Sequence, residues 1–205
     1  MSQIFQAIGT ELSELLSFFV TVALLQNIVL TTGFGSSVVL HMVRKPKNIW
    51  LFSGMLAFFS VFTVIIAYPL DQLLGTAVNN YWRPLMMVGI TVVLYIVAYL
   101  VLSRACPKFY ARISRLLPMA AFNNLVTGIA LVCNLQFSSS LGGNIGLAIG
   151  SCLGFALLTW LTAEGIERMD NPDMPEAFRG MPSTLVYLGL LALALMGFTS
   201  NFSLI

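Results

Sequence analysis

The sequence predicts an all-α integral membrane protein with six transmembrane helices, arranged as an inverted repeat of three plus three. Three observations predict this fold class: an apolar composition, six apolar stretches, and basic residues concentrated in alternate connections. Of the 205 residues, 58% are hydrophobic and only 9% are charged, whereas soluble domains carry about 25% charged residues. This composition leaves no room for a soluble domain, so we expect a single membrane domain over residues 1–205.

The charged and metal-binding residues exclude several classes of protein. Ten basic and eight acidic residues give a net charge of +2, which is too little for a nucleic-acid surface. The three cysteines form no CxxC pair and His41 is the single histidine, so neither a disulfide framework nor a zinc site is expected. Because the first basic residue is Arg44, the first apolar run is not a cleaved secretory signal and should stay in the mature protein.

Six apolar stretches are bounded by polar residues, proline or glycine, and each approaches the about 20 residues that cross a bilayer. They are residues 12–30, 49–68, 84–102, 117–135, 145–161 and 184–202. The connections after the first, third and fifth stretches hold nine of the ten basic residues: Arg44, Lys45, Lys47, Arg104, Lys108, Arg112, Arg115, Arg168 and Arg179. Only Arg83 lies elsewhere. Because basic connections stay on the cytoplasmic side, both termini are expected on the non-cytoplasmic side.

Two of the basic connections have a pattern of their own. Residues 106–116 mix basic and apolar residues, which fits either an amphipathic helix on the inner membrane interface or an ordinary anchoring loop. Residues 164–182 contain most of the acids and three prolines, which prevent one continuous helix. We expect a folded cytoplasmic loop there, with a partner-docking surface at Glu167, Arg168, Asp173, Phe178 and Arg179.

The first and fourth stretches are interrupted by polar residues and glycine. Non-helical backbone at membrane depth is tolerated only where protein or a wet cavity surrounds it. Because three spans separate the interruptions, the halves 1–103 and 104–205 should enter the membrane in opposite directions, with a site at their interface. The candidate polar path or interface consists of Gln26, Asn27, Gly33, Gly35, Ser37, Asn123 and Asn124.

The amide side chains in these interruptions have two interpretations. Amides are costly in hydrocarbon unless they are paired, so they should face each other or water. They either join helices by hydrogen bonds or lie on an ion or electron path. Glu14, the one acid within an apolar run, is either an interfacial anchor or an ion-entry site.

The fifth stretch carries a strip of glycines that predicts close helix packing. Gly142, Gly146, Gly150 and Gly154 recur at every fourth residue, so they share one face and allow another backbone to approach. The neighbour is either another span of this chain or a second subunit, and the spacing does not distinguish the two.

The loop and the interruptions together resemble a known family. The loop reads Glu167-Arg168-Met169, Asp173-Met174-Pro175 and Phe178-Arg179-Gly180. Its order and spacing are similar to those of the Rnf/Nqr integral membrane subunits, most like the A subunit of the Rnf electron-transport complex. That protein is related to the D and E subunits of the sodium-pumping NADH:quinone reductase. Asn27-Ile28-Val29-Leu30, and Leu117-Pro118 with Asn123, resemble the same proteins, so the likeness covers nearly the whole chain.

The resemblance implies two such subunits packed as an inverted dimer around a [2Fe-2S] cluster, with two cysteine ligands from each. The matching positions in this chain are Ser37 and Asn124. Neither a hydroxyl nor an amide replaces a thiolate on iron, so we expect no [2Fe-2S] cluster, no other cofactor and no metal. Cys106, Cys133 and Cys152 lie elsewhere and are expected to be small buried or interfacial residues.

The resulting prediction is a non-catalytic subunit of a redox-driven, ion-translocating complex in the prokaryotic inner membrane. Its expected partners are membrane lipid, a paralogous six-span subunit or a second copy, and Rnf-like redox subunits; nucleic acid is excluded. An independent small transporter or channel with its site at the repeat interface is the alternative. A membrane anchor without transport activity is a third interpretation.

Overall fold

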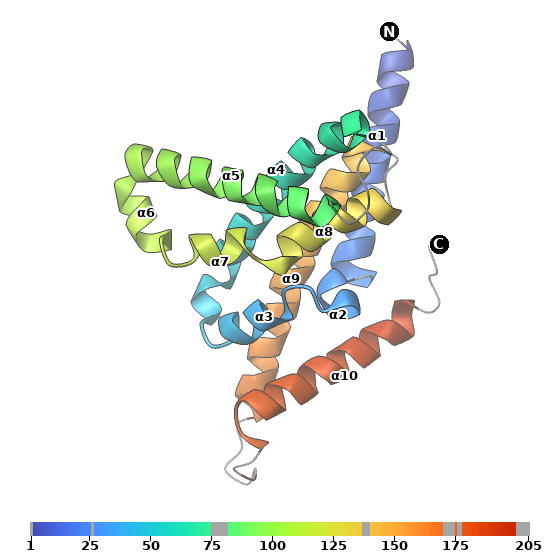
Figure 1. Ribbon diagram of the computed structural model, residues 1–205. Coiled ribbons are helices and arrows are strands. Elements are labelled where there is room, and N and C mark those ends of the chain that lie inside the picture. Colours follow the sequence, from blue (N-terminus) through green and yellow to red (C-terminus); the bar gives the residue numbers. More distant parts are fainter. Residues whose placement is uncertain are drawn as a thin grey trace.

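The computed structural model describes residues 2–25, 27–74, 82–136, 140–169, 175 and 178–199, and all secondary structure within them is helical (Figure 1). The helices and helical turns are α1 (Ser2–Val20), η1 (Thr21–Leu25), α2 (Ile28–Thr32), α3 (Ser36–Met42), η2 (Pro46–Asn48), α4 (Ile49–Leu74), α5 (Arg83–Ala105), α6 (Pro107–Ile113), α7 (Leu117–Ala121), α8 (Asn124–Gln136), α9 (Leu141–Met169) and α10 (Met181–Thr199). The all-α prediction is confirmed for this part of the chain.

Among the described residues, three helices are long and apolar enough to cross a membrane: Pro46–Leu70, Arg83–Ala105 and Leu141–Arg168. A fourth span results if Pro107–Ile113 and Leu117–Cys133, which are bent by 66°, are counted together. α10 contains the shorter apolar helix Met181–Leu195. A multi-pass membrane protein is therefore supported, but the described residues contain three or four candidate spans and do not show the predicted six. The first apolar stretch is divided among α1, η1 and α2.

α9 is the central helix of the bundle. α1 and α4 pack along it, α8 and α5 pack against α4, and α10 crosses its C-terminal part (Figure 1). The core between α4 and α9 is aromatic: the rings of Phe52 and Phe155 lie 5.7 Å apart and both side chains are fully buried. α5 is the most exposed of the three long helices, which suits a helix that faces lipid.

The helix boundaries differ from the expected ones at the start of α1 and at the end of α9. α1 begins at Ser2 rather than at residue 12, and its residues Glu11 and Glu14 bind the start of α9. α9 continues to Met169, so the first part of the expected loop at 164–182 is helical. An ion pair between Glu164 and Arg168, one turn apart, supports this extension, and the first proline comes only at 172.

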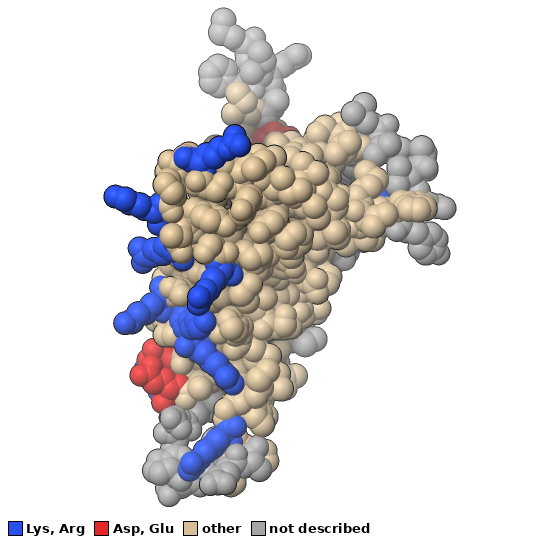
Figure 2. All heavy atoms as spheres, turned by 60° about the vertical axis from the view of Figure 1, so that its left-hand side comes forward, with Lys and Arg blue, Asp and Glu red and all other residues tan. Residues whose placement is uncertain are grey.

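Residues 106–116 form a short helix rather than an irregular loop. α6 covers Pro107–Ile113, with proline at its first position, where the missing N–H has no helical partner to lose. The helical alternative is therefore the one observed. Figure 2 shows Lys and Arg side chains following one edge of the molecule, beside a broad face that is almost free of charge.

Candidate functional site

Asn27 begins the first interruption and uses both polar atoms of its side chain. Its Oδ1 accepts a hydrogen bond from the Val29 backbone N–H (3.0 Å) and so caps α2. Its Nδ2 donates to the Gly154 carbonyl oxygen (2.9 Å), and the residue is only 6% exposed. Asn27 therefore joins α2 to α9. Gln26, the other amide predicted here, lies outside the described residues.

Two glycines turn the chain between α2 and α3. Gly33 and Gly35 have φ values of +74° and +80°, in the left-handed region that other residues rarely adopt. The Ser36 N–H donates to the Gly33 carbonyl oxygen (3.2 Å) across this turn. α3 then begins at Ser36, and Ser37 lies exposed on its first turn.

Asn123 occupies the corresponding place in the second interruption, between α7 and α8. Its Oδ1 accepts from the Leu125 backbone N–H (3.1 Å), with the same two-residue spacing that links Asn27 to Val29. The side chain is 3% exposed. Its Nδ2 is buried and has no hydrogen-bond acceptor among the described residues. Asn124, the next residue, is exposed.

The two interruptions touch each other. A Cβ atom built on Gly35 would lie 3.3 Å from Asn123 Oδ1, and one built on Gly128 would lie 2.7 Å from Phe34 Cε2. The backbone of the first turn therefore sits against Asn123, and the Phe34 ring fills the notch at Gly128. The structure thus brings Gly35 and Asn123 together, with Ser37 and Asn124 exposed within two residues of that contact.

The glycine strip of α9 receives α1 and η1 of the same chain, which answers the question that its spacing left open. A Cβ on Gly150 would lie 2.7 Å from the Phe19 carbonyl oxygen. A Cβ on Gly146 would overlap the Leu15 carbonyl oxygen. Gly142 meets the Glu11 backbone, and Gly154 meets the side chain of Asn27. The strip is therefore what allows Gly154 to approach the first interruption closely.

The two glutamates of α1 bind the N-terminus of α9. The Ser140 hydroxyl accepts from the Gly143 N–H (3.0 Å), and Glu11 Oε2 accepts from the Gly142 N–H (2.6 Å). Glu14 accepts from the Ser140 hydroxyl. Carboxylates are favoured near helix N-termini, where the dipole is positive. Glu14 therefore joins α1 to α9, a role that neither of its two interpretations included.

Sequence reasoning also missed the hydroxyls of α4 that face α9. Ser53 Oγ donates to the Cys152 carbonyl oxygen (2.7 Å), and Cys152 Sγ donates to Ser60 Oγ (3.6 Å). Cys133 Sγ similarly contacts the Asn144 carbonyl oxygen (3.8 Å). The available signal was the seven-residue spacing of the two serines, which puts them on one helical face.

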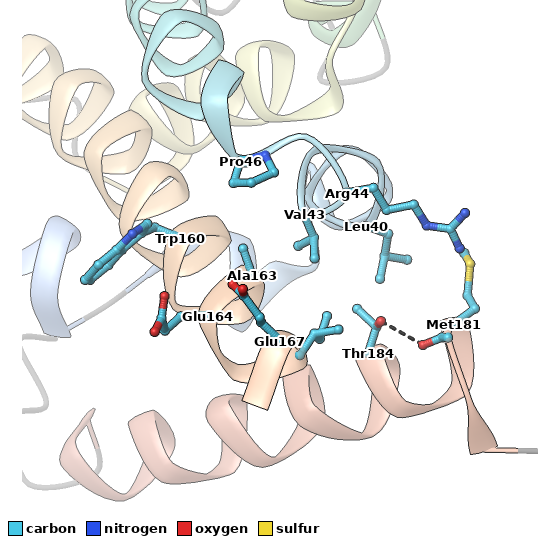
Figure 3. A pocket seen from close by; sticks show the side chains of 12 residues that line it. Leu40, Val43, Arg44, Pro46, Trp160, Ala163, Glu164, Glu167, Met181 and Thr184 are labelled. Atoms are coloured by element: carbon cyan, nitrogen blue, oxygen red, sulfur yellow. Dashed lines mark hydrogen bonds between the residues drawn. The ribbon is translucent and has the colours of Figure 1, made fainter. Parts of the chain in front are cut away.

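A cavity of about 280 Å³ lies at the other end of α9, between α3, α9 and α10. Glu164 and Glu167 line it from α9, while Arg44 lies near Met181 on the opposite side (Figure 3). Of the predicted docking residues, Glu167 thus faces this cavity.

The remaining docking residues are distributed differently. Arg168 is exposed on α9 and pairs with Glu164 at 3.3 Å. Phe178 is 56% exposed and Arg179 is exposed beside it. Asp173 lies outside the described residues. The described members therefore form a charged and aromatic surface at one end of the molecule.

Comparison with known proteins decides the family. The family of Rnf-Nqr subunits, which are membrane proteins, matches residues 15–201. The chain belongs to the Rnf-Nqr family. Among its relatives, a protein of Pasteurella multocida that is named as the A subunit of an ion-translocating oxidoreductase complex is 28% identical over 189 residues, which cover 92% of this chain and 98% of that protein.

Two further Rnf-Nqr relatives carry the same name. The protein from Histophilus somni is 30% identical over 184 residues, covering 88% of this chain and 93% of its own length. That from Syntrophotalea carbinolica is 29% identical over 188 residues, covering 91% and 97%. The likeness therefore extends over nearly the whole chain, including both interruptions, the glycine strip and the docking loop.

The donor atoms at the two positions that the resemblance assigns to cluster ligands do not fit a [2Fe-2S] cluster. Ser37 and Asn124 offer a hydroxyl and an amide, whereas such clusters are held by thiolates. Cys133 and Cys152 are buried in contacts with other helices. Within the described part of the chain, no group of three or more His, Cys, Asp and Glu side chains could hold a metal ion.

Proposed function

We propose that this chain is a non-catalytic integral membrane subunit of an Rnf-like ion-translocating oxidoreductase complex, and that it contributes no [2Fe-2S] ligands. The contact between Gly35 and Asn123 carries this proposal, because Ser37 and Asn124 are both exposed within two residues of it. The proposed role of that surface is to receive a companion subunit. The relatives are each named as the A subunit of an ion-translocating complex, and these names support membership in such an assembly.

We further propose six spans in two inverted halves, residues 1–103 and 104–205, with both termini on the non-cytoplasmic side. The packing of the helices supports this repeat. In the first half, α1 packs on α9 and α5 packs on α4. The equivalent helices of the second half make the equivalent contacts: α8 packs on α4 and α10 packs on α9. α4 and α9, the middle helices of the two halves, pack on each other, as an internal two-fold axis requires.

The companion-subunit proposal is tested by disturbing the exposed surface while the core is left intact. The variant Ser37→Trp with Asn124→Trp is expected to lose a six-span companion that co-purifies with the wild-type chain. Leu190→Trp, a change at another exposed position, on α10, should retain it. Retention of the companion by the double variant would contradict the proposed surface.

The ligand proposal is tested by spectroscopy on the chain purified with its companion. We expect neither the visible absorption nor the paramagnetic signal of a [2Fe-2S] centre. A signal that disappears in Cys133→Ser or Cys152→Ser would show that these thiols replace the missing ligands, and it would overturn the proposal.

A second candidate function, an independent transporter or channel, is favoured by one observation. The Asn123 Nδ2 donor is buried beside the interruptions and has no acceptor among the described residues, so it is available to a solute oxygen. The purified chain in liposomes should then conduct Na⁺, H⁺ or a small solute, and Asn123→Leu should reduce that flux. Flux no higher than that of empty vesicles would exclude this candidate.

A further inference from the structure

An apolar groove of about 600 Å³ lies between α4 and α5 and extends to α6 and α7. Figure 1 shows α6 joining the far end of α5 to α7, which returns toward α8. Every lining residue is apolar or glycine. The volume falls in the range of about 300–1,000 Å³ that is usual for ligand sites. The groove is therefore large enough for a ligand, and its lining suits hydrocarbon.

The length of the groove matches one leaflet of a bilayer. Its lining on α4 runs from Trp50 to Phe62, which is about 18 Å at 1.5 Å per residue. One leaflet of a bilayer contributes about 15 Å of hydrocarbon. Trp50 and Phe62 are both exposed, so the groove is open along its side to the surrounding membrane. An acyl chain of one leaflet thus fits its full length.

One end of the groove is basic. Lys47 lies one turn before Trp50, and Arg104 lies one turn after Val101. Lys108 and Arg112 on α6 are the sequence neighbours of the lining residues Phe109 and Ile113. All four basic side chains are exposed.

No acid neutralises this basic end from nearby in the sequence. Asp and Glu are absent from residues 15–70 and 72–163. The acid on α4, Asp71, lies nine residues beyond Phe62, the lining residue at the other end of the groove. Charge complementarity therefore favours an anion at the end of the groove next to Trp50. Tryptophan is common at the membrane–water interface, so this end is expected to lie at the level of the lipid headgroups.

We propose that this groove holds one anionic glycerophospholipid of the cytoplasmic leaflet. Its acyl chain lies along α4 between Trp50 and Phe62, and its phosphate lies among Lys47, Arg104, Lys108 and Arg112. This assignment rests on the proposed orientation of the chain and is independent of its membership in a redox complex. An apolar companion helix would fill the groove equally well, but it would leave the four positive charges without a counterpart.

The acyl-chain part of the proposal is tested by filling the groove. Gly54 lines it, and a Cβ added there meets nothing within 4 Å, so Gly54→Trp occupies the groove without displacing a helix. Gly189 on α10 is equally open, and Gly189→Trp is the matched control. Native mass spectrometry of the full chain, purified with any companion, should show a bound phosphatidylglycerol in the wild type and in the control. The Gly54→Trp variant should lack it.

The headgroup part is tested by titrating the detergent-purified chain with phosphatidylglycerol or with phosphatidylcholine. In the variant Lys108→Gln with Arg112→Gln, phosphatidylglycerol should bind about 30-fold more weakly, which corresponds to about 1 kcal/mol for each lost charge. Phosphatidylcholine binding should not change. The control variant Arg168→Gln with Arg179→Gln removes two exposed charges from the end of α9 and the start of α10, and it should bind phosphatidylglycerol as the wild type does.

Three results would overturn the proposal. The first is lipid retention by the Gly54→Trp variant, and the second is equal binding of the two lipids by the wild type. The third is loss of a companion subunit in Gly54→Trp with the lipid content unchanged, which would make the groove a subunit interface. The first two results do not bear on the exposed surface at Ser37 and Asn124, and the third is separated from it by the variant Ser37→Trp with Asn124→Trp, so failure here is distinguishable from failure of the proposed function.

Discussion

Asn27 and Asn123 each cap a helix that restarts after a break, but only Asn27 also has an acceptor for its amide nitrogen within the described structure. The two residues therefore differ in how completely their side chains are hydrogen-bonded. Asn27 is fixed by bonds to α2 and α9, which makes it a structural joint. Asn123 has a buried donor left over, and a buried donor without a partner costs about 1–3 kcal/mol. The second candidate function would supply an acceptor for this donor.

Asn27→Asp tests the structural joint. The aspartate keeps an oxygen for the Val29 N–H but turns a carboxylate oxygen toward the Gly154 carbonyl, where Nδ2 now donates at 2.9 Å. We expect a loss of about 1–3 kcal/mol in stability, seen as a lower thermal unfolding midpoint in detergent. Asn124→Asp is the control, because that side chain is exposed at the start of α8, where an acid is favourable. Equal losses in both variants would contradict the assignment.

Gly128→Ala tests the contact between the two interruptions. The added methyl group would overlap the Phe34 ring, so we expect a cost of about 1–3 kcal/mol from overpacking. Adding Phe34→Ala should make the Gly128→Ala change less costly, and the coupling follows from a double-mutant cycle of unfolding midpoints. Gly89→Ala is the control, because its Cβ meets nothing within 4 Å; it should stabilise the chain slightly. Additive effects would show that Phe34 and Gly128 are not in contact.

At the scale of elements, the interruptions were predictable because glycine and amide residues are conspicuous within apolar sequence. Gly33 and Gly35 occur where a left-handed backbone is needed, and Asn27 and Asn123 occur where helices restart. The start of α1 was not predictable. Its N-terminal half is too polar to be recognised as a span, and the bonds that its glutamates make lie about 130 residues away in the sequence.

The glycine strip shows the same limit. The four-residue spacing of the glycines identifies the face of α9 that lacks side chains. It does not identify the neighbouring helix, which depends on how the whole bundle packs. Gly146→Leu should separate α1 from α9, because even a Cβ there overlaps the Leu15 backbone. We expect a loss of at least about 3 kcal/mol, the upper end of overpacking costs, together with faster proteolysis of α1. Gly9→Leu, on an open face of α1, should leave both measurements unchanged. A wild-type proteolysis rate in Gly146→Leu would refute this packing.

At the scale of the whole molecule, the basic residues and the helix packing carry separate information. The alternation of basic connections predicts an orientation from charge alone, and Figure 2 shows those residues along one edge of the structure. The pairing of α1 with α9 and of α8 with α4 could not be read from charge. This pairing depends on which apolar faces fit together. In the sequence, the short match between the two interruptions was the feature that indicated it.

The native cysteines offer a direct test of the proposed orientation. Cys106 is exposed between α5 and α6, on a basic connection, whereas Cys133 and Cys152 are buried. A membrane-impermeant maleimide should therefore label the chain in inside-out vesicles but not in intact cells, and Cys106→Ser should abolish the labelling. In that cysteine-to-serine background, Trp82→Cys, at the exposed start of α5, should be labelled in intact cells. The reverse pattern would place the basic edge outside and would remove the cytoplasmic leaflet from the proposed lipid site.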